Sequence, residues 1–153
     1  MTPLPEDLAQ RAISREGDRL FFHATGVAVA GKGVLILGPT GSGKSTLALD
    51  LMALGAALIS DDGIWLEAGQ LCAPKSAPAL IEARGIGLLN AGSLCPIAPL
   101  MAVADLSRTE PERLPPTRSA LVHDQKAMLI LGAEQHRLAV SLSHLLRYGK
   151  ADV

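Results

Sequence analysis

The stretch VLILGPTGSGKSTLALDL, residues 34–51, constrains the fold of this chain more than any other part of it. It begins with four apolar residues, continues through three glycines within six positions, and ends with leucines at helical spacing. This order predicts a buried strand, a glycine-rich turn and a helix. A strand that leads into a helix through a tight turn is typical of α/β folds, so we expect an α/β domain.

The turn satisfies the phosphate-loop motif G-x-x-x-x-G-K-[ST] in full, in the strand–turn–helix context that the motif requires. Its glycines let backbone N–H groups approach phosphate oxygens, and the start of the helix adds partial positive charge. Lys44 is expected to neutralise the β- and γ-phosphates of a nucleotide, and the Ser45 hydroxyl to bind Mg²⁺. The motif alone does not say whether the nucleotide is a fuel, a switch ligand or a phosphoryl donor. The predicted phosphate-binding residues are Gly38, Pro39, Thr40, Gly41, Ser42, Gly43, Lys44, Ser45 and Thr46.

The composition argues against a nucleic-acid-binding function. The chain has 153 residues, of which 48% are hydrophobic, enough for one domain with a well-formed core, so residues 1–153 are predicted to form a single domain. Only 3% of the residues are aromatic and the net charge is −1. Nucleic-acid-binding proteins usually carry basic patches and stacking aromatics. We therefore expect no nucleic-acid partner.

The chain also lacks targeting and membrane signals. Its first twenty residues are charged and contain no apolar segment like that of a signal peptide. No apolar run approaches the ~18 residues needed to span a bilayer. We expect a cytoplasmic protein without a membrane partner. Cys72 and Cys95 form no C-x-x-C pair and have no histidine at metal-ligand spacing, so we expect ordinary reduced core thiols.

The segments around the phosphate loop follow clear patterns. Alternating, valine-rich residues at 20–38 predict a hairpin whose second strand, 34–37, runs into the loop. This is unusual, because the commonest nucleotide-binding folds place the loop after the first strand of a parallel sheet, without a leading hairpin. Leucine spacing predicts a helix over 45–54 that ends at Gly55, and residues 56–60 read as a short buried strand.

Weaker patterns describe the remainder of the chain. Residues 63–73 predict a second hairpin with Gly69 in its turn, and the proline-containing stretch 74–90 predicts a loop. The other expected elements are a short helix at 5–16, strands at 100–107 and 127–132, and a helix at 136–149.

Two adjacent carboxylates, Asp61 and Asp62, lie 17 and 18 residues beyond Lys44. A helix of about ten residues and a returning strand would bring them back beside the phosphate loop. Carboxylates placed there could hold Mg²⁺ or accept a proton from an attacking hydroxyl. The alternative is a solvated polar turn after a strand. Because consecutive strand residues point to opposite sides, the two are expected to have different roles.

Glu82, Arg84 and His23 are ambiguous when taken alone. The carboxylate and guanidinium of Glu82 and Arg84 could face Mg²⁺ and phosphate. A pair of exposed charges beside a flexible turn is the more favoured interpretation. His23 lies on the predicted hairpin, where an isolated histidine is more often a packing residue than a catalyst.

Several of these pieces together resemble the catalytic domain of bacterial HPr kinase/phosphorylase, over roughly residues 20–90. In that family a hairpin also precedes the phosphate loop, and a histidine stands 21 residues before the loop lysine, as His23 does here. The family also has paired aspartates after the helix and a Glu-x-Arg-Gly signature. The matching residues are His23, Lys44, Asp61, Asp62, Glu82, Arg84 and Gly85.

The resemblance implies a P-loop kinase fold with a mixed sheet and an antiparallel hairpin before the phosphate-loop strand. It also implies an ATP- and Mg²⁺-dependent protein serine kinase that phosphorylates the phosphocarrier protein HPr of the sugar phosphotransferase system. Such an enzyme regulates carbohydrate metabolism, and family members can remove the phosphate again by phosphorolysis. The family usually assembles into a ring of subunits, a hexamer, so a homo-oligomer is expected.

Site roles follow from the same resemblance. Asp62 would be the base that accepts the serine proton, with His23 assisting it. The departures are an N-terminal domain of the full-length enzymes, which this chain is expected to lack, and Thr46 where the family often has an acidic residue. The implied catalytic residues are Asp62, His23, Lys44 and Arg113; Arg84 joins the nucleotide-binding residues; the implied metal ligands are Ser45, Asp61 and Glu82.

Two other functions remain open. A small-metabolite kinase of the shikimate or gluconate kind also places an acidic residue one helix and one strand after the phosphate loop. It needs an arginine-rich lid, however, and residues 110–118 hold two arginines among three prolines. The other alternative is a non-catalytic nucleotide-binding switch, although the chain contains no N-K-x-D guanine-reading motif.

Overall fold

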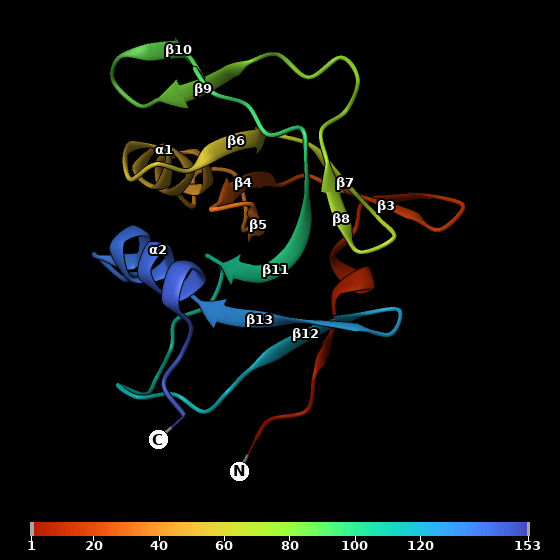
Figure 1. Cartoon of the computed structure of the whole chain (residues 1–153), viewed down its shortest axis with the longest axis vertical. Helices are drawn as coiled ribbons and strands as arrows, with labels where there is room; N and C mark the ends of the chain where they lie inside the picture. Colours follow the sequence, from red (N-terminus) through yellow and green to blue (C-terminus); the bar gives the residue numbers. More distant parts are fainter. Residues whose placement is uncertain (1, 153) are drawn as a thin grey trace.

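The computed structural model describes residues 2–152. Within this range eleven strands form one curled mixed sheet, two more form a small separate sheet, and two α-helices pack on the large sheet (Figure 1). The helices are α1 (Lys44–Ala53) and α2 (Leu138–Tyr148). The strands are β1 (Glu6–Asp7), β2 (Ser14–Glu16), β3 (Arg19–Phe22), β4 (Thr25–Val29), β5 (Lys32–Leu37), β6 (Ala57–Ser60), β7 (Ile64–Glu67), β8 (Gln70–Cys72), β9 (Leu80–Ala83), β10 (Gly87–Asn90), β11 (Ile97–Asp105), β12 (Ser119–Val122) and β13 (Gln125–Leu131).

Strand β5 lies at the centre of the sheet and is covered on both faces. It pairs antiparallel with β4 on one side and parallel with β11 on the other. Val34 and Ile36 pack in the cluster that contains α1 and α2, whereas Leu35 and Leu37 pack in a second cluster on the opposite face. Since both faces are buried, the strand is apolar throughout, which explains its run of four apolar residues.

Strand β11 joins the two halves of the large sheet. Its first residues pair antiparallel with β8, and its later residues pair parallel with β5 and β13. From β8 the sheet continues through β7, β3 and β2, all antiparallel. The register sets Asp105 opposite Leu37, so β11 ends beside the start of the phosphate loop.

The expected fold class is confirmed. The hairpin before the phosphate loop is β4 and β5, the helix after the loop is α1, and the returning strand is β6. The second hairpin is β7 and β8, with Gly69 in the turn. The predicted C-terminal helix is α2, and the strands expected at 100–107 and 127–132 are β11 and β13.

Two expectations about elements were wrong, and one strand was not expected. Residues 5–16 contain β1, a short 3-10 helix (Leu8–Arg11) and β2 in place of one helix, because Ile13 donates its backbone N–H to Phe21 and draws the chain into the sheet. The stretch 74–90 is not only a loop, since β9 and β10 form an antiparallel ribbon there. Strand β12, which pairs with β13, has no sequence prediction.

Cys72 and Cys95 are free thiols, as expected, but both are half-buried and not fully enclosed in the core. Burial raises the pKa of the Cys72 thiol, with a smaller contribution from Glu67. In the described part of the chain, neither α1 nor α2 combines the length and apolarity needed to cross a membrane.

Candidate active site

The phosphate loop connects β5 to α1 through a tightly wound backbone. Gly38 has a φ of 149° and Gly43 a φ of 99°, both in the region that favours glycine. A Cβ atom on Gly38 would collide with the Ser42 hydroxyl and lie 3.2 Å from the Leu106 Cβ. The chain can therefore form this loop only with glycine at position 38.

The loop buries two polar groups, the ammonium of Lys44 and the hydroxyl of Ser42. The buried Lys44 donates from Nζ to the Gly38 and Pro39 carbonyls, at 2.7 and 3.2 Å. Ser42 Oγ is buried and, among residues 2–152, has no hydrogen-bond partner. Buried hydroxyls are nearly always paired, so the loop has a donor that an anionic oxygen could satisfy.

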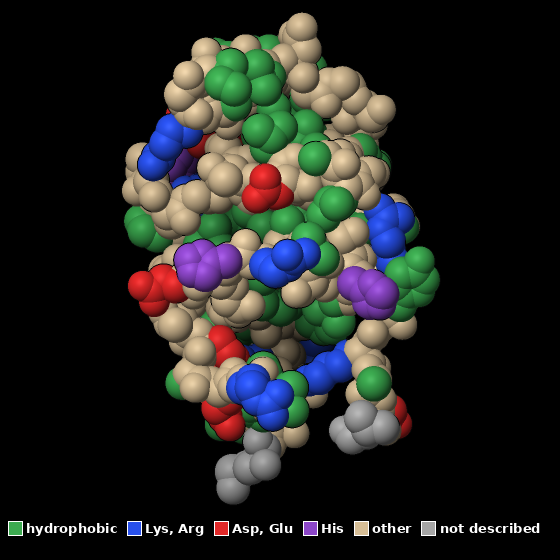
Figure 2. Space-filling model, turned by 90° about the vertical axis from the view of Figure 1, so that its left-hand side faces the viewer, with side chains coloured by type: hydrophobic (Ala, Val, Ile, Leu, Met, Phe, Trp, Pro, Cys, Tyr) green, Lys and Arg blue, Asp and Glu red, His purple; other side chains and the backbone are tan. Residues whose placement is uncertain are grey.

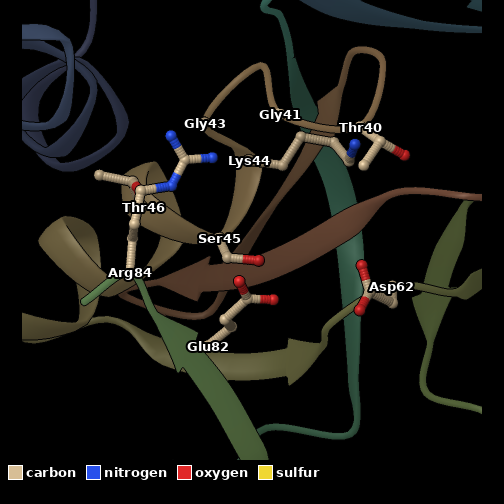
Figure 3. A pocket seen from close by; sticks show the side chains of 9 residues that line it. All are labelled: Thr40, Gly41, Gly43, Lys44, Ser45, Thr46, Asp62, Glu82 and Arg84. Atoms are coloured by element: carbon tan, nitrogen blue, oxygen red, sulfur yellow. The ribbon is translucent and has the colours of Figure 1, made fainter. Parts of the chain in front are cut away.

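A pocket of about 160 Å³ opens beside the loop, and three segments far apart in sequence contribute to it (Figure 3). The phosphate loop and the first turn of α1 form one side. Asp62 comes from the turn after β6, and Glu82 and Arg84 come from the β9–β10 ribbon. The lining residues are Thr40, Gly41, Gly43, Lys44, Ser45, Thr46, Asp62, Glu82 and Arg84.

Asp61 is bonded to the loop serine and to a buried threonine. Ser45 Oγ lies 2.9 and 3.0 Å from the two carboxylate oxygens of Asp61, and Thr25 Oγ1 donates to Asp61 Oδ1 at 2.7 Å. Thr25 is completely buried at the start of β4. Sequence reasoning missed Thr25, and the register that brings it beside Asp61 arises only from the pairing of β4 with β6.

Asp62 has a different environment from its neighbour. Its φ is 62°, a left-handed conformation that aspartate tolerates better than most residues and that is found often at functional sites. Ser60 Oγ donates to the Gly63 carbonyl at 2.6 Å and closes the turn around it. Asp61 is thus hydrogen-bonded to Ser45 and Thr25, while Asp62 lines the pocket.

Glu82 and Arg84 are both exposed beside a turn, as the sequence taken alone favoured, and both also line the pocket. Ile81 and Ala83 on the other face of β9 are buried, and Ile81 packs in the cluster with α1. That packing fixes the ribbon beside the helix start and turns Glu82 toward Ser45 (Figure 3).

His23 lies beside the Asp61–Asp62 turn but does not line the pocket. It is exposed, in the bend between β3 and β4. Phe22 pairs with Ile64, and Gly26 pairs with Ser60, so residues 23–25 and 61–63 run alongside each other between those pairs. His23 is therefore close to Asp62 in space, because these two backbone segments run side by side.

Arg113 is not brought to the pocket. It is exposed in the segment between β11 and β12. Arg118 of this segment pairs with Glu110 through two hydrogen bonds of 2.8 and 2.9 Å. The segment lies against β13 and α2, where Pro115 and Pro116 line a separate apolar groove of about 290 Å³.

A second hollow of about 270 Å³ adjoins the phosphate pocket and shares Gly43 and Thr46 with it. Its opposite wall comes from the segment between β13 and α2, including Glu134 and His136. The start of α1 thus lies between two spaces, one lined by Asp62, Glu82 and Arg84 and one near the C-terminal helix.

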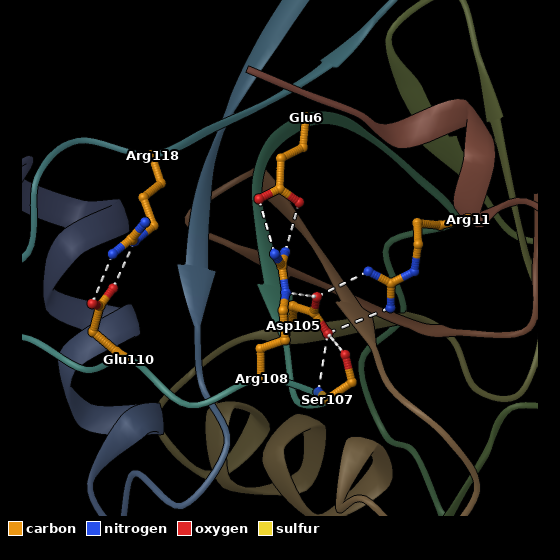
Figure 4. Close-up of polar contacts among 7 residues, drawn as sticks. All are labelled: Glu6, Arg11, Asp105, Ser107, Arg108, Glu110 and Arg118. Atoms are coloured by element: carbon orange, nitrogen blue, oxygen red, sulfur yellow. Dashed lines mark hydrogen bonds and ion pairs between the residues drawn. The ribbon is translucent and has the colours of Figure 1, made fainter. Parts of the chain in front are cut away.

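A charged network stabilises the end of β11 next to the loop (Figure 4). The fully buried Asp105 carboxylate accepts hydrogen bonds from Arg11 at 2.9 Å, Arg108 at 3.0 Å and Ser107 Oγ at 2.6 Å. Arg108 also binds Glu6 of the N-terminal segment. Burial acts to raise the pKa of Asp105, but the hydrogen bonds from Arg11 and Ser107 outweigh it and hold that pKa well below its usual range.

The carboxylates of Asp61 and Glu82 suit a Mg²⁺ ion that is also bound by phosphate oxygens. They suit less well a metal ion whose ligands all come from the protein. Among residues 2–152, no group of three or more histidine, cysteine, aspartate or glutamate side chains is placed to hold a metal ion. Mg²⁺ bound with nucleotide usually needs one or two carboxylates, the remaining ligands being phosphate and water. The oxygens of Ser45, Asp61 and Glu82 fit that requirement.

Comparison with known proteins identifies close relatives of this architecture. The model of the HPr Serine kinase C-terminal domain matches residues 17–103, a range that contains His23, the phosphate loop, Asp62 and the β9–β10 ribbon but excludes Arg113. A solved structure, the HPr(Ser) kinase/phosphatase from Coxiella burnetii, superposes with a TM-score of 0.66 at 26% identity, covering 83% of this chain and 93% of that one.

Curated relatives carry similar names. HPr kinase/phosphorylase of Geobacillus thermodenitrificans (strain NG80-2) is 33% identical over 129 residues, which is 77% of this chain and 41% of the relative. The protein of the same name from Azoarcus sp. (strain BH72) is 28% identical over 158 residues, covering 93% of this chain and 50% of the relative. The chain thus spans half or less of the length of these relatives.

Proposed function

Because the chain belongs to the family of HPr serine kinase C-terminal domains, we propose that it transfers the γ-phosphoryl group of ATP to a serine hydroxyl of the phosphocarrier protein HPr. The observation that carries this proposal is the pocket in which a phosphate loop, a carboxylate and an arginine meet. Acting on HPr, it would control the use of carbohydrates, and we place this activity in the cytoplasm, where ATP is available.

The loop binds the donor in this proposal. Backbone N–H groups of residues 40, 41 and 43–45 at the start of α1 hold the β- and γ-phosphates, and Lys44 moves its ammonium group from the loop carbonyls to them. Ser42 Oγ donates to a phosphate oxygen and gains the partner that it otherwise lacks. The adjoining hollow shared through Gly43 and Thr46 has room for the nucleoside.

Mg²⁺ would be held by Ser45 Oγ together with the carboxylates of Asp61 and Glu82, as the donor set allows. When bound, the ion supplies positive charge that offsets the charge of the phosphates during transfer. Asp61 orients Ser45, because its carboxylate is already bonded to that hydroxyl. Arg84 projects into the same pocket and adds a further positive charge for the transferred phosphoryl group.

Asp62 acts as the general base. Its carboxylate lines the pocket, whereas both oxygens of Asp61 are engaged by Ser45. The acceptor serine loses its proton to Asp62 as its oxygen bonds to the γ-phosphorus and ADP leaves. His23 lies in the backbone segment next to that of Asp62 and assists by orienting it. The role of Arg113 stays a prediction, and so does assembly into a homo-oligomer.

The same residues can run the chemistry backwards. In phosphorolysis, inorganic phosphate takes the place of the β-phosphate of ADP, its oxygen bonds to the phosphorus of phosphoserine to form pyrophosphate, and protonated Asp62 returns its proton to the serine oxygen that leaves. We include this reaction in the proposal because the names of the relatives combine kinase with phosphorylase.

A small-metabolite kinase is less well supported. The antiparallel strand β4 lies directly beside the phosphate-loop strand, whereas kinases of that kind have a parallel sheet there. The segment that would serve as a lid lies against β13 and α2, with Arg118 paired to Glu110. A non-catalytic switch would not require a carboxylate such as Asp62 at the reaction pocket.

The test is incubation of the purified protein with γ-labelled ATP, Mg²⁺ and HPr, with small hydroxylated metabolites in parallel reactions. Label is expected on HPr alone, as phosphoserine. Label in a small metabolite would instead support the metabolite kinase, and tight ATP binding with no labelled acceptor would support the switch.

A further inference from the structure

The ribbon of β9 and β10 has two faces that differ in chemistry. One face is buried, since Ile81 and Ala83 are 1% and 7% exposed and Ile81 packs with α1. The other face includes Leu88 of β10, which is 69% exposed, and the turn between β9 and β10 holds Ile86, which is 80% exposed. The turn is closed by a hydrogen bond from the Ile86 N–H to the Ala83 carbonyl.

This exposed apolar face is continuous with the reaction pocket. Leu88 pairs directly with Glu82, and residues paired across antiparallel strands project to the same face with Cβ atoms about 5 Å apart. Glu82 lines the pocket, as does Arg84, two residues before Ile86. Figure 2 shows hydrophobic side chains at the upper end of the molecule, the end that the ribbon occupies in Figure 1. The rim of the pocket is therefore apolar on this side.

We propose that Ile86 and Leu88 form the docking surface for the protein acceptor, which contacts them with an apolar side chain located close to its target serine. This inference rests on the proposed function, since it concerns the acceptor of the same reaction. A serine that reaches Asp62 and the γ-phosphate must approach over the rim, so the body of a folded acceptor covers the ribbon face. A small polar metabolite would enter the pocket without gaining anything from Leu88.

The chemistry of the ribbon favours a transient partner. Isolated exposed apolar residues are common. Two of them at the rim of a reaction pocket, however, form an apolar surface that a protein acceptor can bury when it binds. The same ribbon carries Glu82 and Arg84, so docking on Leu88 also presses these groups against the donor. Binding of the acceptor and assembly of the catalytic groups are thereby coupled through one small element.

The experiment compares Ile86→Ser, Leu88→Ser and the double variant with wild type, using ATP–Mg²⁺ and HPr. Leu4→Ser is the matched control, because Leu4 is 87% exposed and lies near the N-terminus, at the end of the molecule opposite the ribbon. For each protein, KM for HPr, kcat, ATP affinity and oligomeric state by sedimentation are measured.

The double variant is expected to raise KM for HPr roughly tenfold, with ATP affinity unchanged and the Leu4→Ser control behaving as wild type. Unchanged KM in the ribbon variants of an active kinase would overturn the docking proposal and leave the proposed function intact. Loss of activity that follows dissociation of subunits would also overturn it, because the face would then bind a second copy of the chain. Absence of HPr phosphorylation by wild type would overturn the proposed function, and the docking surface with it.

Discussion

At the scale of single residues, the adjacent carboxylates Asp61 and Asp62 differ in chemistry because their surroundings differ. Asp61 accepts hydrogen bonds from Ser45 and Thr25, while Asp62 lies at the pocket in a left-handed conformation. The sequence predicted that the two would differ, because neighbours in an extended chain point apart. The partners themselves were beyond prediction, since Thr25 is 36 residues from Asp61 in the sequence and meets it only through the pairing of β4 with β6.

The base role of Asp62 gives a direct prediction. Asp62→Asn should lower kcat for HPr phosphorylation by ~10²- to 10⁴-fold, because the amide cannot accept the serine proton. Nucleotide affinity, measured by titration calorimetry, should change little, since the loop and Lys44 hold the phosphates. Equal loss of affinity and rate would instead make Asp62 a structural or metal-binding residue.

The hydroxyl of Thr25 is predicted to position Asp61 toward Mg²⁺. Thr25→Val should weaken binding of Mg²⁺–ATP by about tenfold relative to Mg²⁺-free ATP, as for other residues that orient a metal ligand. Thr25→Ser retains the donor and should restore wild-type Mg²⁺ dependence. If valine and serine variants behaved alike, the hydrogen bond to Asp61 would have no functional role.

At the scale of elements, local signals identified the helix and most strands but not the β9–β10 ribbon. The stretch 74–90 contains two prolines and three glycine or asparagine residues, which favour a loop by local rules. The ribbon forms because Ile81 can be buried against α1, a long-range contact. The Glu-x-Arg-Gly signature nevertheless identified Glu82 and Arg84 as site candidates, because a resemblance between whole motifs does not depend on local propensity.

The phosphate loop is an element whose backbone permits a sharp test. Gly38→Ala would place a Cβ against Ser42 Oγ and Leu106 and force the loop out of shape. We expect a loss of ATP affinity of at least about tenfold with a thermal stability close to wild type, because the loop is exposed on its other side. Gly41→Ala is the control, because Gly41 also has a positive φ, 85°, but a Cβ there would meet nothing within 4 Å; this variant has backbone strain without the collision and should have a smaller effect. Equal effects from both substitutions would contradict the steric account.

At the scale of the whole molecule, the network around Asp105 ties the N-terminal segment to the large sheet. Arg11 and Arg108 converge on Asp105, and Arg108 reaches Glu6. The Leu106 N–H, next along the chain, donates to the Leu37 carbonyl at the start of the phosphate loop. The sequence offered no signal for this network, since its members are separated by up to 102 residues.

This network predicts a pH dependence of stability. The pKa of Asp105 is lower in the folded protein than its ordinary value of 3.8, so the folded state binds fewer protons. The network therefore contributes fully above pH 5, and its contribution falls as the pH drops through 3.8 toward the folded-state value. Asp105→Asn should cost of the order of 2 kcal/mol at pH 7, below the range for fully buried pairs because both arginines are partly exposed.

Urea unfolding of wild type and Asp105→Asn at pH 7, 5, 4 and 3 checks this account. The difference in the free energy of unfolding should shrink as the pH falls. A difference that stays constant down to pH 3 would show that the ionised carboxylate is not what stabilises the end of β11.

The central claim is that the pocket at the phosphate loop transfers phosphoryl groups to a protein serine. The most direct measurement is mass spectrometry of intact HPr and its peptides after incubation with this protein and ATP–Mg²⁺. The account predicts the gain of one phosphoryl group on a single serine, abolished by Lys44→Ala. Unmodified HPr in the presence of protein that binds ATP would contradict it.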